Sequence, residues 1–483
     1  MVKDSCADVL EQLEGAELGA TTTEPVKVGS GIFGSLTSCG PRRGVVFMVL
    51  MGCIVLVNMW GSVLNLRLLM APSGQLMDGS EIAESYCSAP LEVSATPAAL
   101  IEHMHGQGLT LRQLVVTIRH GDRSAIHSIP GADDVEWPCP STFQSDQVKQ
   151  AWPGISKFQV VDLDGDAVDD TLQAQQIEEG VCSPGQLTER GVFQHLTLGG
   201  SFRTTYAAFL KGMKKADMLV QSTRYTRTLA SAASFITGML PHASFTPSII
   251  TDTGLSGEVM TGEAGCSQAE YLQEQESALF SVRTDVTNYI ESLFGTDMAG
   301  SPITQLADVL HARSCHSLPL PCTGRSCFTR EYAEAVMLEA DRALCFRFFG
   351  ARGGRKSSSL LIYPFLRELR KAMEKPQHKF ILFSGHDTVI APVLGALGAY
   401  DCIWPPYGSS LIFEVWGREG RADWTERTDK FVRVIYNARV VTQYITDCQT
   451  GSEYGLEFCP LEDFFATIES AIAPHATFQE ACQ

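Results

Sequence analysis

The stretch LRQLVVTIRHGDR, from Leu111 to Arg123, decides the fold. Its apolar run Leu114–Ile118 is typical of a short buried strand, and the glycine that follows indicates a turn. The strand therefore delivers Arg119, His120 and Arg123 to one end of a sheet. Guanidinium groups bind phosphoryl oxygens and neutralise their charge, while a neutral imidazole offers a nucleophilic nitrogen. The turn is thus suited to phosphate chemistry, although a basic turn at the surface has the same short pattern.

The composition of the 483-residue chain is that of a globular protein, with 45% hydrophobic and 19% charged residues. A chain of this length exceeds one minimal domain and can bury a large core. The net charge of −18 at pH 7 argues against nucleic acid as a partner, because nucleic-acid-binding proteins need basic surfaces. An anionic substrate would therefore have to be met by local positive charge.

An uncharged apolar segment, Val45–Leu64, predicts a transmembrane helix. Its 20 residues, at about 1.5 Å each, match a bilayer core of roughly 30 Å. The length of the segment and of the chain before it disfavours a cleaved signal peptide, and buried helices of soluble proteins rarely lack every charge. Arg42 and Arg43 precede the segment and Arg67 follows it, so the positive-inside rule favours a cytosolic N-terminus.

This segment divides the chain into parts on the two sides of a membrane. We expect a cytosolic tail over 1–43, a signal anchor over 44–66, a stem over 67–108 and a folded lumenal domain over 109–483. Within that domain, helical patterns over about 245–355 predict a helical subdomain inserted over the sheet. The expected topology is type II, with a single pass.

The cysteines support a lumenal domain. Of the 15 cysteines, only Cys6, Cys39 and Cys53 precede residue 80, and the even number beyond it is typical of a disulfide-bonded ectodomain. A zinc site in Cys315–Cys327 is the alternative, but its spacing matches no paired C-x-x-C pattern. The acidic loop Val160–Asp170 lacks the glycine and final glutamate of a calcium loop, which favours a solvated loop.

Two further stretches combine a strand, a polar turn and a helix. Met218–Gln221 predicts a strand before a helix of small residues, so Arg224 and Arg227 fall at the junction, where helix N-termini favour anions. Phe380–Phe383 predicts a second strand, which exposes His386 and Asp387 before a helix that starts near Val389. A carboxylic acid here can protonate a leaving oxygen and an imidazole can bind phosphate, although Asp387 can equally cap the helix.

Regular patterns fill most of the remaining domain. We expect a helix over Gly185–Leu210, where His195 is a packing or hydrogen-bonding residue rather than a catalyst. We also expect antiparallel strands over Ser409–Trp416 and Lys430–Val441 with a turn near Asn437, and a closing helix over Leu461–Ile472.

Three motifs carry a resemblance to a known family. R-H-G-D-R at 119–123, S-T-x-x-x-R-T at 222–228 and G-H-D-T at 385–388 resemble the histidine acid phosphatases, branch 2 of the histidine phosphatase superfamily. The resemblance covers about 110–483. It implies an α/β fold: a three-layer domain with a central, largely parallel sheet and an inserted helical cap, here behind the transmembrane helix. Both motif strands would end side by side at the carboxyl edge of the sheet, where open α/β sheets bind ligands.

The resemblance also implies roles for single residues. His120 would be the nucleophile that forms a phosphohistidine, and Asp387 would protonate the leaving alcohol. Arg224 receives no role, because many acid phosphatases have an acidic residue there. No metal or other cofactor is expected, because arginines supply the charge neutralisation that a metal ion would give. The residues implied to bind the substrate phosphate are Arg119, Arg123, Arg227 and His386.

Shorter phrases resemble a Golgi member of this family: ESYC at 84–87, VCSPGQLTERGVFQHL at 181–196, PCTGRSC at 321–327 and FCPLEDF at 458–464. They imply a phosphomonoesterase, in a single-pass Golgi membrane protein, that removes the 2-phosphate from xylose in the glycosaminoglycan–protein linkage region. They also imply a linker glycosyltransferase as a partner. The alternatives are a membrane-anchored acid phosphatase of broad specificity and an inactive glycan-binding or scaffold protein. The last needs no proton donor beside a nucleophile, so His120 and Asp387 argue against it.

Overall fold

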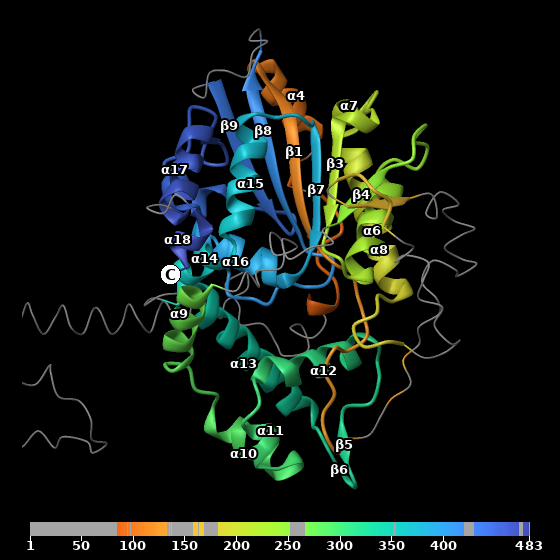
Figure 1. Cartoon of the computed structure of the whole chain (residues 1–483), viewed down its shortest axis with the longest axis vertical. Coiled ribbons are helices and arrows are strands. Elements are labelled where there is room, and N and C mark those ends of the chain that lie inside the picture. The colour runs from red at the N-terminus through yellow and green to blue at the C-terminus, as the bar shows by residue number, and fades with distance from the viewer. Residues whose placement is uncertain are drawn as a thin grey trace, which may run out of the picture. The chain divides into compact units, whose positions relative to one another are not determined.

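Figure 1 shows a computed structural model of the chain. It describes residues 85–482 except 94, 97, 133–134, 136, 138–157, 163, 169–181, 252–265, 351–353, 420–428 and 473–476. The expected tail, the apolar segment and residues 67–84 of the expected stem lie outside the described residues. Within the described part, no helix has the length and apolar character that crossing a membrane requires.

A mixed α/β sheet forms the centre of the described domain. The strand order is β10-β9-β8-β1-β7-β3-β4-β2, and β11 pairs with β9. Five neighbouring strands are parallel: β1 (Leu109–Arg119), β7 (Phe380–Gly385), β3 (Met218–Ser222), β4 (Ser248–Thr251) and β2 (Gln159–Val161). The other pairings are antiparallel: β8 (Ser410–Arg418), β9 (Lys430–Tyr436), β10 (Arg439–Val440) and β11 (Cys459–Pro460). The sheet therefore agrees with the expected architecture, with a parallel part that contains both motif strands.

The strand at Leu114–Ile118 lies in the middle of this sheet, as β1 between β7 and β8. Its last seven residues are all buried, as is typical of a strand covered on both faces. Leu114, Val116 and Ile118 pack in one apolar cluster, whereas Val115 packs in another on the opposite face. The alternation places β1 at the boundary between two helical layers.

Helices cover both faces of the sheet, which makes three layers (Figure 1). One face packs against α4 (Ala98–Gly106), α6 (Glu189–Thr205) and α8 (Thr226–Met239). The other packs against α14 (Gly354–Leu361), α15 (Tyr363–Glu374), α16 (Asp387–Leu397) and α17 (Leu461–Ile472). The short helices are α7 (Ala207–Leu210), α18 (Phe478–Ala481) and the 3-10 turns Lys215–Asp217, Thr442–Tyr444 and Thr446–Cys448.

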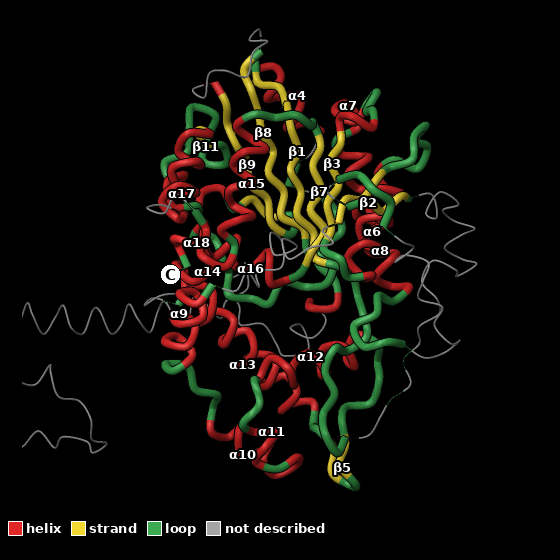
Figure 2. Tube along the Cα trace, viewed as in Figure 1, coloured by secondary structure: helices red, strands yellow, loops and turns green. Residues whose placement is uncertain are grey.

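A helical cap lies at one end of the sheet, below it in Figure 2. It contains α9 (Ser267–Ser277), α10 (Thr284–Phe294), α11 (Thr296–Ala299), α12 (Ile303–Cys315), the hairpin β5 (Cys322–Thr323) and β6 (Ser326–Cys327), and α13 (Arg330–Phe349). The start of the range expected to be helical differs, because Ser248–Thr251 forms β4, which lies between β3 and β2 in the sheet. The apolar residues of α12 and α13 belong to the same cluster as α14–α17, so the cap shares its core with the sheet.

The described residues that precede β1 belong to the folded body, although they fall within the range expected to be a stem. Tyr86 is 3% exposed, and its neighbour Cys87 forms a disulfide with Cys315 of α12. Four more disulfides join described cysteines, as the cysteine distribution predicts: Cys266–Cys482, Cys322–Cys327, Cys345–Cys402 and Cys448–Cys459.

Candidate active site

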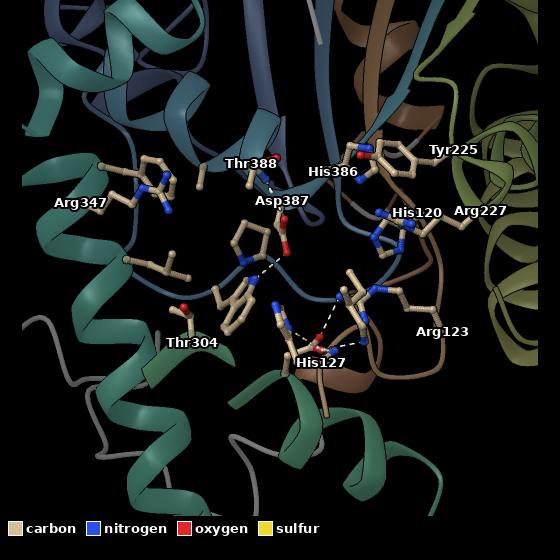
Figure 3. A pocket seen from close by; sticks show the side chains of 17 residues that line it. His120, Arg123, His127, Tyr225, Arg227, Thr304, Arg347, His386, Asp387 and Thr388 are labelled. Carbon is tan, nitrogen blue, oxygen red and sulfur yellow. Dashed lines mark hydrogen bonds and ion pairs between the residues drawn. The ribbon is translucent and has the colours of Figure 1, made fainter. Parts of the chain in front are cut away.

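The carboxyl ends of β1 and β7 bring two histidines together (Figure 3). The strands are parallel neighbours with Arg119 opposite Gly385, so His120 and His386 follow at the same edge of the sheet. The backbone N–H of His120 donates to the carbonyl oxygen of Gly385 at 3.0 Å, and the two imidazole centroids are 5.6 Å apart. The prediction that the two motif strands end side by side is confirmed.

The turn after β1 packs so closely on α6 that its glycine cannot carry a side chain. A methyl group on Gly121 would lie 2.4 Å from the carbonyl oxygen of Gly191, and one on Gly191 would lie 2.3 Å from that of Asp122. The carboxylate of Asp122 is buried here, where it accepts a 2.5 Å hydrogen bond from the Thr188 hydroxyl and pairs with His316 at 2.7 Å. Asp122 therefore stabilises the turn.

His120 directs one ring nitrogen with a lone pair toward a pocket. Its Nδ1 lies 2.8 Å from the carbonyl oxygen of Gly121, which can only accept, so Nδ1 carries the proton and Nε2 does not. Burial, and then the charges of Arg227 and Arg119, hold the pKa of His120 well below its ordinary value. The imidazole is therefore neutral even in weakly acidic solution.

Arg119 is fully buried and contacts the carboxylate of Asp387. Its Nη2 pairs with Oδ2 of Asp387 at 2.9 Å and donates to the hydroxyl of Tyr86 at 2.7 Å. Its Nη1 donates to the carbonyl oxygen of Pro405. Arg119 therefore joins the end of β1 to the start of α16.

Arg123 is paired with an aspartate from the cap. Its Nη2 lies 2.9 Å from Oδ1 of Asp308 in α12, whose other carboxylate oxygen accepts from the backbone N–H groups of Ile126 and His127 at 2.8 and 3.1 Å. Burial raises the pKa of Asp308, but Arg123 and the hydrogen bonds outweigh it and lower that pKa. This pair connects the turn after β1 to the cap.

Arg227 and His386 complete one side of the pocket, where Arg227 is charged and His386 is neutral. The guanidinium carbon of Arg227 is 4.3 Å from the ring centroid of Tyr225, and burial and Arg123 lower the pKa of Arg227 to about 10. Nε2 of His386 lies 3.0 Å from the hydroxyl of Thr223, and burial and Arg227 lower the pKa of His386 to about 3. Because the positive charges of Arg123 and Arg227 repel each other here, a bound anion would relieve their repulsion.

Asp387 begins α16 and accepts two more hydrogen bonds. Its Oδ2 accepts from the indole N–H of Trp404 at 2.6 Å and its Oδ1 from the backbone N–H of Thr388 at 2.8 Å. Burial raises the pKa of Asp387, but Arg119 and Trp404 outweigh it, so that pKa lies below its ordinary value. The helix begins before the expected Val389, which places the carboxylate in the first turn, where the helix dipole favours negative charge.

Comparison with known protein families gives this arrangement a context. The model of the histidine phosphatase superfamily (branch 2) matches residues 110–437, more than half of the chain. The chain belongs to this family. It is a phosphomonoester hydrolase, as its three motifs imply.

Sequence alignments with relatives cover most of this histidine phosphatase. The 2-phosphoxylose phosphatase 1 of Xenopus tropicalis is 26% identical over 419 residues, which cover 80% of this chain and 79% of the relative. The protein of the same name from Homo sapiens is 27% identical over 375 residues, or 72% and 75% of the two chains. The lysophosphatidic acid phosphatase type 6 of Mus musculus is 24% identical over 383 residues, or 74% and 85%.

Solved structures share the fold of this histidine phosphatase. The apo form of Hafnia alvei phytase superimposes with a TM-score of 0.50 at 15% sequence identity and covers 78% of this chain and 98% of that one. At this identity the likeness concerns the fold alone.

Most of the predicted site residues of this histidine phosphatase line one pocket: His120, Arg123, Arg227, His386 and Asp387. Arg119 is not among the lining residues and reaches the site through Asp387. Arg224, to which no role was given, is exposed and also does not line the pocket. Residues from three separate motifs thus converge between the sheet and the cap.

Sequence reasoning missed the residues that support this cluster. Asp308 is a single acidic residue on the buried side of α12, and an isolated carboxylate among apolar helical positions is the signal that could have found it. Tyr86 lies in the expected stem, and Trp404 lies in a loop without a motif. Among the described residues, no group of three or more His, Cys, Asp or Glu side chains is arranged to hold a metal ion.

Proposed function

We propose that this histidine phosphatase hydrolyses phosphomonoesters through a phosphohistidine at His120. The observation that carries the proposal is the lone pair on Nε2, because Nδ1 already bonds the carbonyl oxygen of Gly121. Arg123, Arg227 and His386 line the same pocket and would bind the phosphoryl oxygens, and Arg119 would join them from behind Asp387.

The reaction would proceed in two displacements. Nε2 of His120 attacks phosphorus, the bond to the alcohol oxygen breaks, and that oxygen takes a proton from the carboxylic acid of Asp387. The products of this step are the free alcohol, a phosphohistidine and the Asp387 carboxylate. Water then attacks phosphorus and gives its proton to Asp387, and the N–P bond breaks to release inorganic phosphate.

Asp387 must gain a proton before it can act as an acid, because Arg119 and Trp404 lower its pKa in the ligand-free protein. The substrate resolves this conflict. A phosphomonoester has a second pKa of about 6, so its monoanion brings a proton into the site. The bound phosphate also attracts Arg119 and adds negative charge next to Asp387, and both effects raise the pKa of the carboxyl.

The substrate in this proposal is the 2-phosphate of xylose in the glycosaminoglycan–protein linkage region. Support comes from relatives named 2-phosphoxylose phosphatase 1 and from the apolar segment Val45–Leu64, which suits a type II Golgi enzyme. A linker glycosyltransferase would be a partner in the same membrane. Because the chain also resembles a lysophosphatidic acid phosphatase, broad specificity is the alternative.

The chemistry is tested with detergent-solubilised full-length protein and an aryl phosphate. His120→Ala should abolish turnover and trapping of a phosphoenzyme, and Asp387→Asn should reduce kcat by about 10²- to 10⁴-fold. His105→Ala is the matched control, because His105 lies at the surface of α4 with its side chain 66% exposed. A His120→Ala variant as fast as the parent would refute the nucleophile.

The substrate is tested by comparing kcat/KM for a phosphoxylosyl linker oligosaccharide, lysophosphatidic acid and simple phosphomonoesters. Linker specificity predicts the largest value for the oligosaccharide, and equal values for all three would leave only the broad phosphatase. The topology is tested by protease protection in sealed microsomes. Digestion of the C-terminal domain from outside would reverse the proposed orientation.

A further inference from the structure

The pocket continues beyond the phosphate-binding side to a wall formed by the cap. Thr304 of α12 and Leu344, Arg347 and Phe348 of α13 line this wall. In Figure 3 the labelled side chains of Arg347 and His120 lie on opposite sides of Asp387. None of these cap residues belongs to the three sequence motifs.

His120, Asp387 and Arg347 follow one another across the pocket, and this order sets the direction in which a substrate would lie. The orientation of the substrate rests on the proposed function. In a displacement at phosphorus the attacking and leaving atoms are roughly in line, so the alcohol oxygen points away from His120 and toward the proton of Asp387. The rest of the alcohol then extends past Asp387 to the wall that carries Arg347.

The chemistry of this wall is apolar with one cation. Leu344 and Phe348 are buried, and the indole of Trp404 is 8% exposed beside Asp387. Arg347 is exposed, and its guanidinium carbon is 5.2 Å from the ring centroid of Phe348. A cation supported by an aromatic ring at the mouth of a pocket is suited to an anionic group.

The balance of charge around the pocket gives the position of Arg347 a meaning for substrate selection. Arg119 pairs with Asp387 and Arg123 pairs with Asp308, so part of the positive charge around the phosphate is already balanced by carboxylates. The chain as a whole has a net charge of −18 and repels anionic substrates at long range. Arg347 adds local positive charge at the leaving-group end of the pocket. This charge would favour an alcohol that itself carries an anionic group.

We propose that Arg347 binds a second anionic group on the alcohol part of the substrate, which makes the enzyme selective for phosphomonoesters of acidic alcohols. Arg347 is a specificity residue in this scheme, because it contacts the leaving group and takes no part in proton transfer. Leu344, Phe348 and Trp404 supply the apolar surface on which the body of the alcohol, such as a sugar ring, packs.

Two matched pairs of esters test the subsite with the full-length protein. Glucuronic acid 1-phosphate and glucose 1-phosphate differ only in a carboxylate, as do 3-phosphoglycerate and glycerol 3-phosphate. The readout is the ratio of kcat/KM within a pair, which does not depend on the fraction of folded enzyme. We expect the parent to favour the carboxylated ester of at least one pair by about two- to fivefold.

Three variants separate a local effect from a general one. Arg347→Gln should bring the ratio to about one, and Arg347→Lys should keep a preference because it keeps the charge. Arg330→Gln removes the same charge near the start of α13, where Arg330 pairs with Glu334, and should leave the ratio at the parental value. An equal fall in Arg330→Gln would assign the preference to the overall field and overturn the subsite.

The outcomes also distinguish the subsite from the proposed function. A parent that hydrolyses all four esters with ratios of one, or an unchanged ratio in Arg347→Gln, overturns the subsite and leaves the phosphatase chemistry intact. A parent that hydrolyses none of the esters, and no aryl phosphate, overturns the proposed function and with it the subsite.

Discussion

The hydroxyl of Tyr86 accepts a 2.7 Å hydrogen bond from Nη2 of Arg119, the same nitrogen that pairs with Asp387 at 2.9 Å. The ring of Tyr86 also stacks on His311 of α12, with the centroids 3.7 Å apart. A residue from the range expected to be a stem therefore positions a buried guanidinium of the active site. The Cys87–Cys315 disulfide fixes this segment to the same helix.

Tyr86→Phe should weaken phosphate binding. The phenyl ring keeps the stack on His311 but removes the acceptor, and hydrogen bonds to charged groups contribute about 1.5–3 kcal/mol. We expect the inhibition constant of inorganic phosphate to rise about tenfold and kcat/KM to fall by a similar factor. A purely structural role would lower the unfolding midpoint and leave the inhibition constant unchanged. Tyr289→Phe, in the cap, is the control, because its hydroxyl bonds the carbonyl oxygen of Cys327.

Local sequence patterns could predict the strand ends but not their supports. The apolar runs before His120 and His386 are strands, and the pattern over Leu461–Ile472 is the helix α17. The formation of these strands and of this helix depends on the spacing of apolar residues that are close in the sequence, and that spacing is visible in the sequence. The parallel pairing of β1 and β7 followed only from the family resemblance.

The missed residues reach the site over long sequence separations. Tyr86 contacts Arg119 across 33 residues, and Asp308 contacts Arg123 across 185. Trp404 contacts Asp387 across a shorter separation of 17 residues, but from an irregular loop. Such contacts are set by the docking of the cap and by a disulfide, and neither leaves a periodic pattern in the sequence.

Asp308→Asn should destabilise the protein by about 3 kcal/mol at neutral pH, because it leaves Arg123 buried without a counter-charge. The pKa of Asp308 is lowered in the folded state, so its contribution is complete above the pKa of an unfolded aspartate, about 4, and is lost as the pH falls below that value. Urea unfolding at pH 7, 5 and 3 checks this. We expect the same cost at pH 7 and 5 and a smaller one at pH 3.

The control for that series is Asp285→Asn, because Asp285 pairs with Arg283 at the surface and both side chains are about half exposed. It should leave the unfolding midpoint unchanged at every pH. If Asp308→Asn behaved in the same way, the contact between Arg123 and Asp308 would not contribute to the stability of the fold.

The pH dependence of kcat/KM should lack an acidic limb near 6.5. That parameter reports ionisations of the free enzyme and free substrate, and the pKa values of His120 and His386 are lowered, the second to about 3. The imidazole of His386 therefore stays neutral from pH 7 to about 4, and that of His120 does not gain a proton near 6.5. Because the proton for the leaving group enters with the substrate monoanion, kcat/KM should fall above about pH 6. An aryl phosphate assayed from pH 3.5 to 8 gives the profile; loss of activity on acidification with a midpoint near 6.5 contradicts it.

Asp341→Asn should stabilise the protein at neutral pH but not at acidic pH. The carboxylate of Asp341 in α13 accepts from the backbone N–H of Trp404 at 2.9 Å, and burial, together with Asp401, raises its pKa to about 7. Because this exceeds the value of about 4 for an unfolded aspartate, folding favours the protonated carboxyl. That stability is complete below about pH 4 and is lost as the pH rises toward 7.

Asparagine at position 341 resembles the protonated form of Asp341 at every pH. We therefore expect the free energy of unfolding to rise by about 2–4 kcal/mol at pH 7.5 and not to change at pH 4, measured by urea unfolding. An equal change in the free energy of unfolding at pH 4 and pH 7.5 would contradict this prediction. It would show that Asp341 is ionised in the folded protein at both pH values and that its hydrogen bond to Trp404 needs no bound proton.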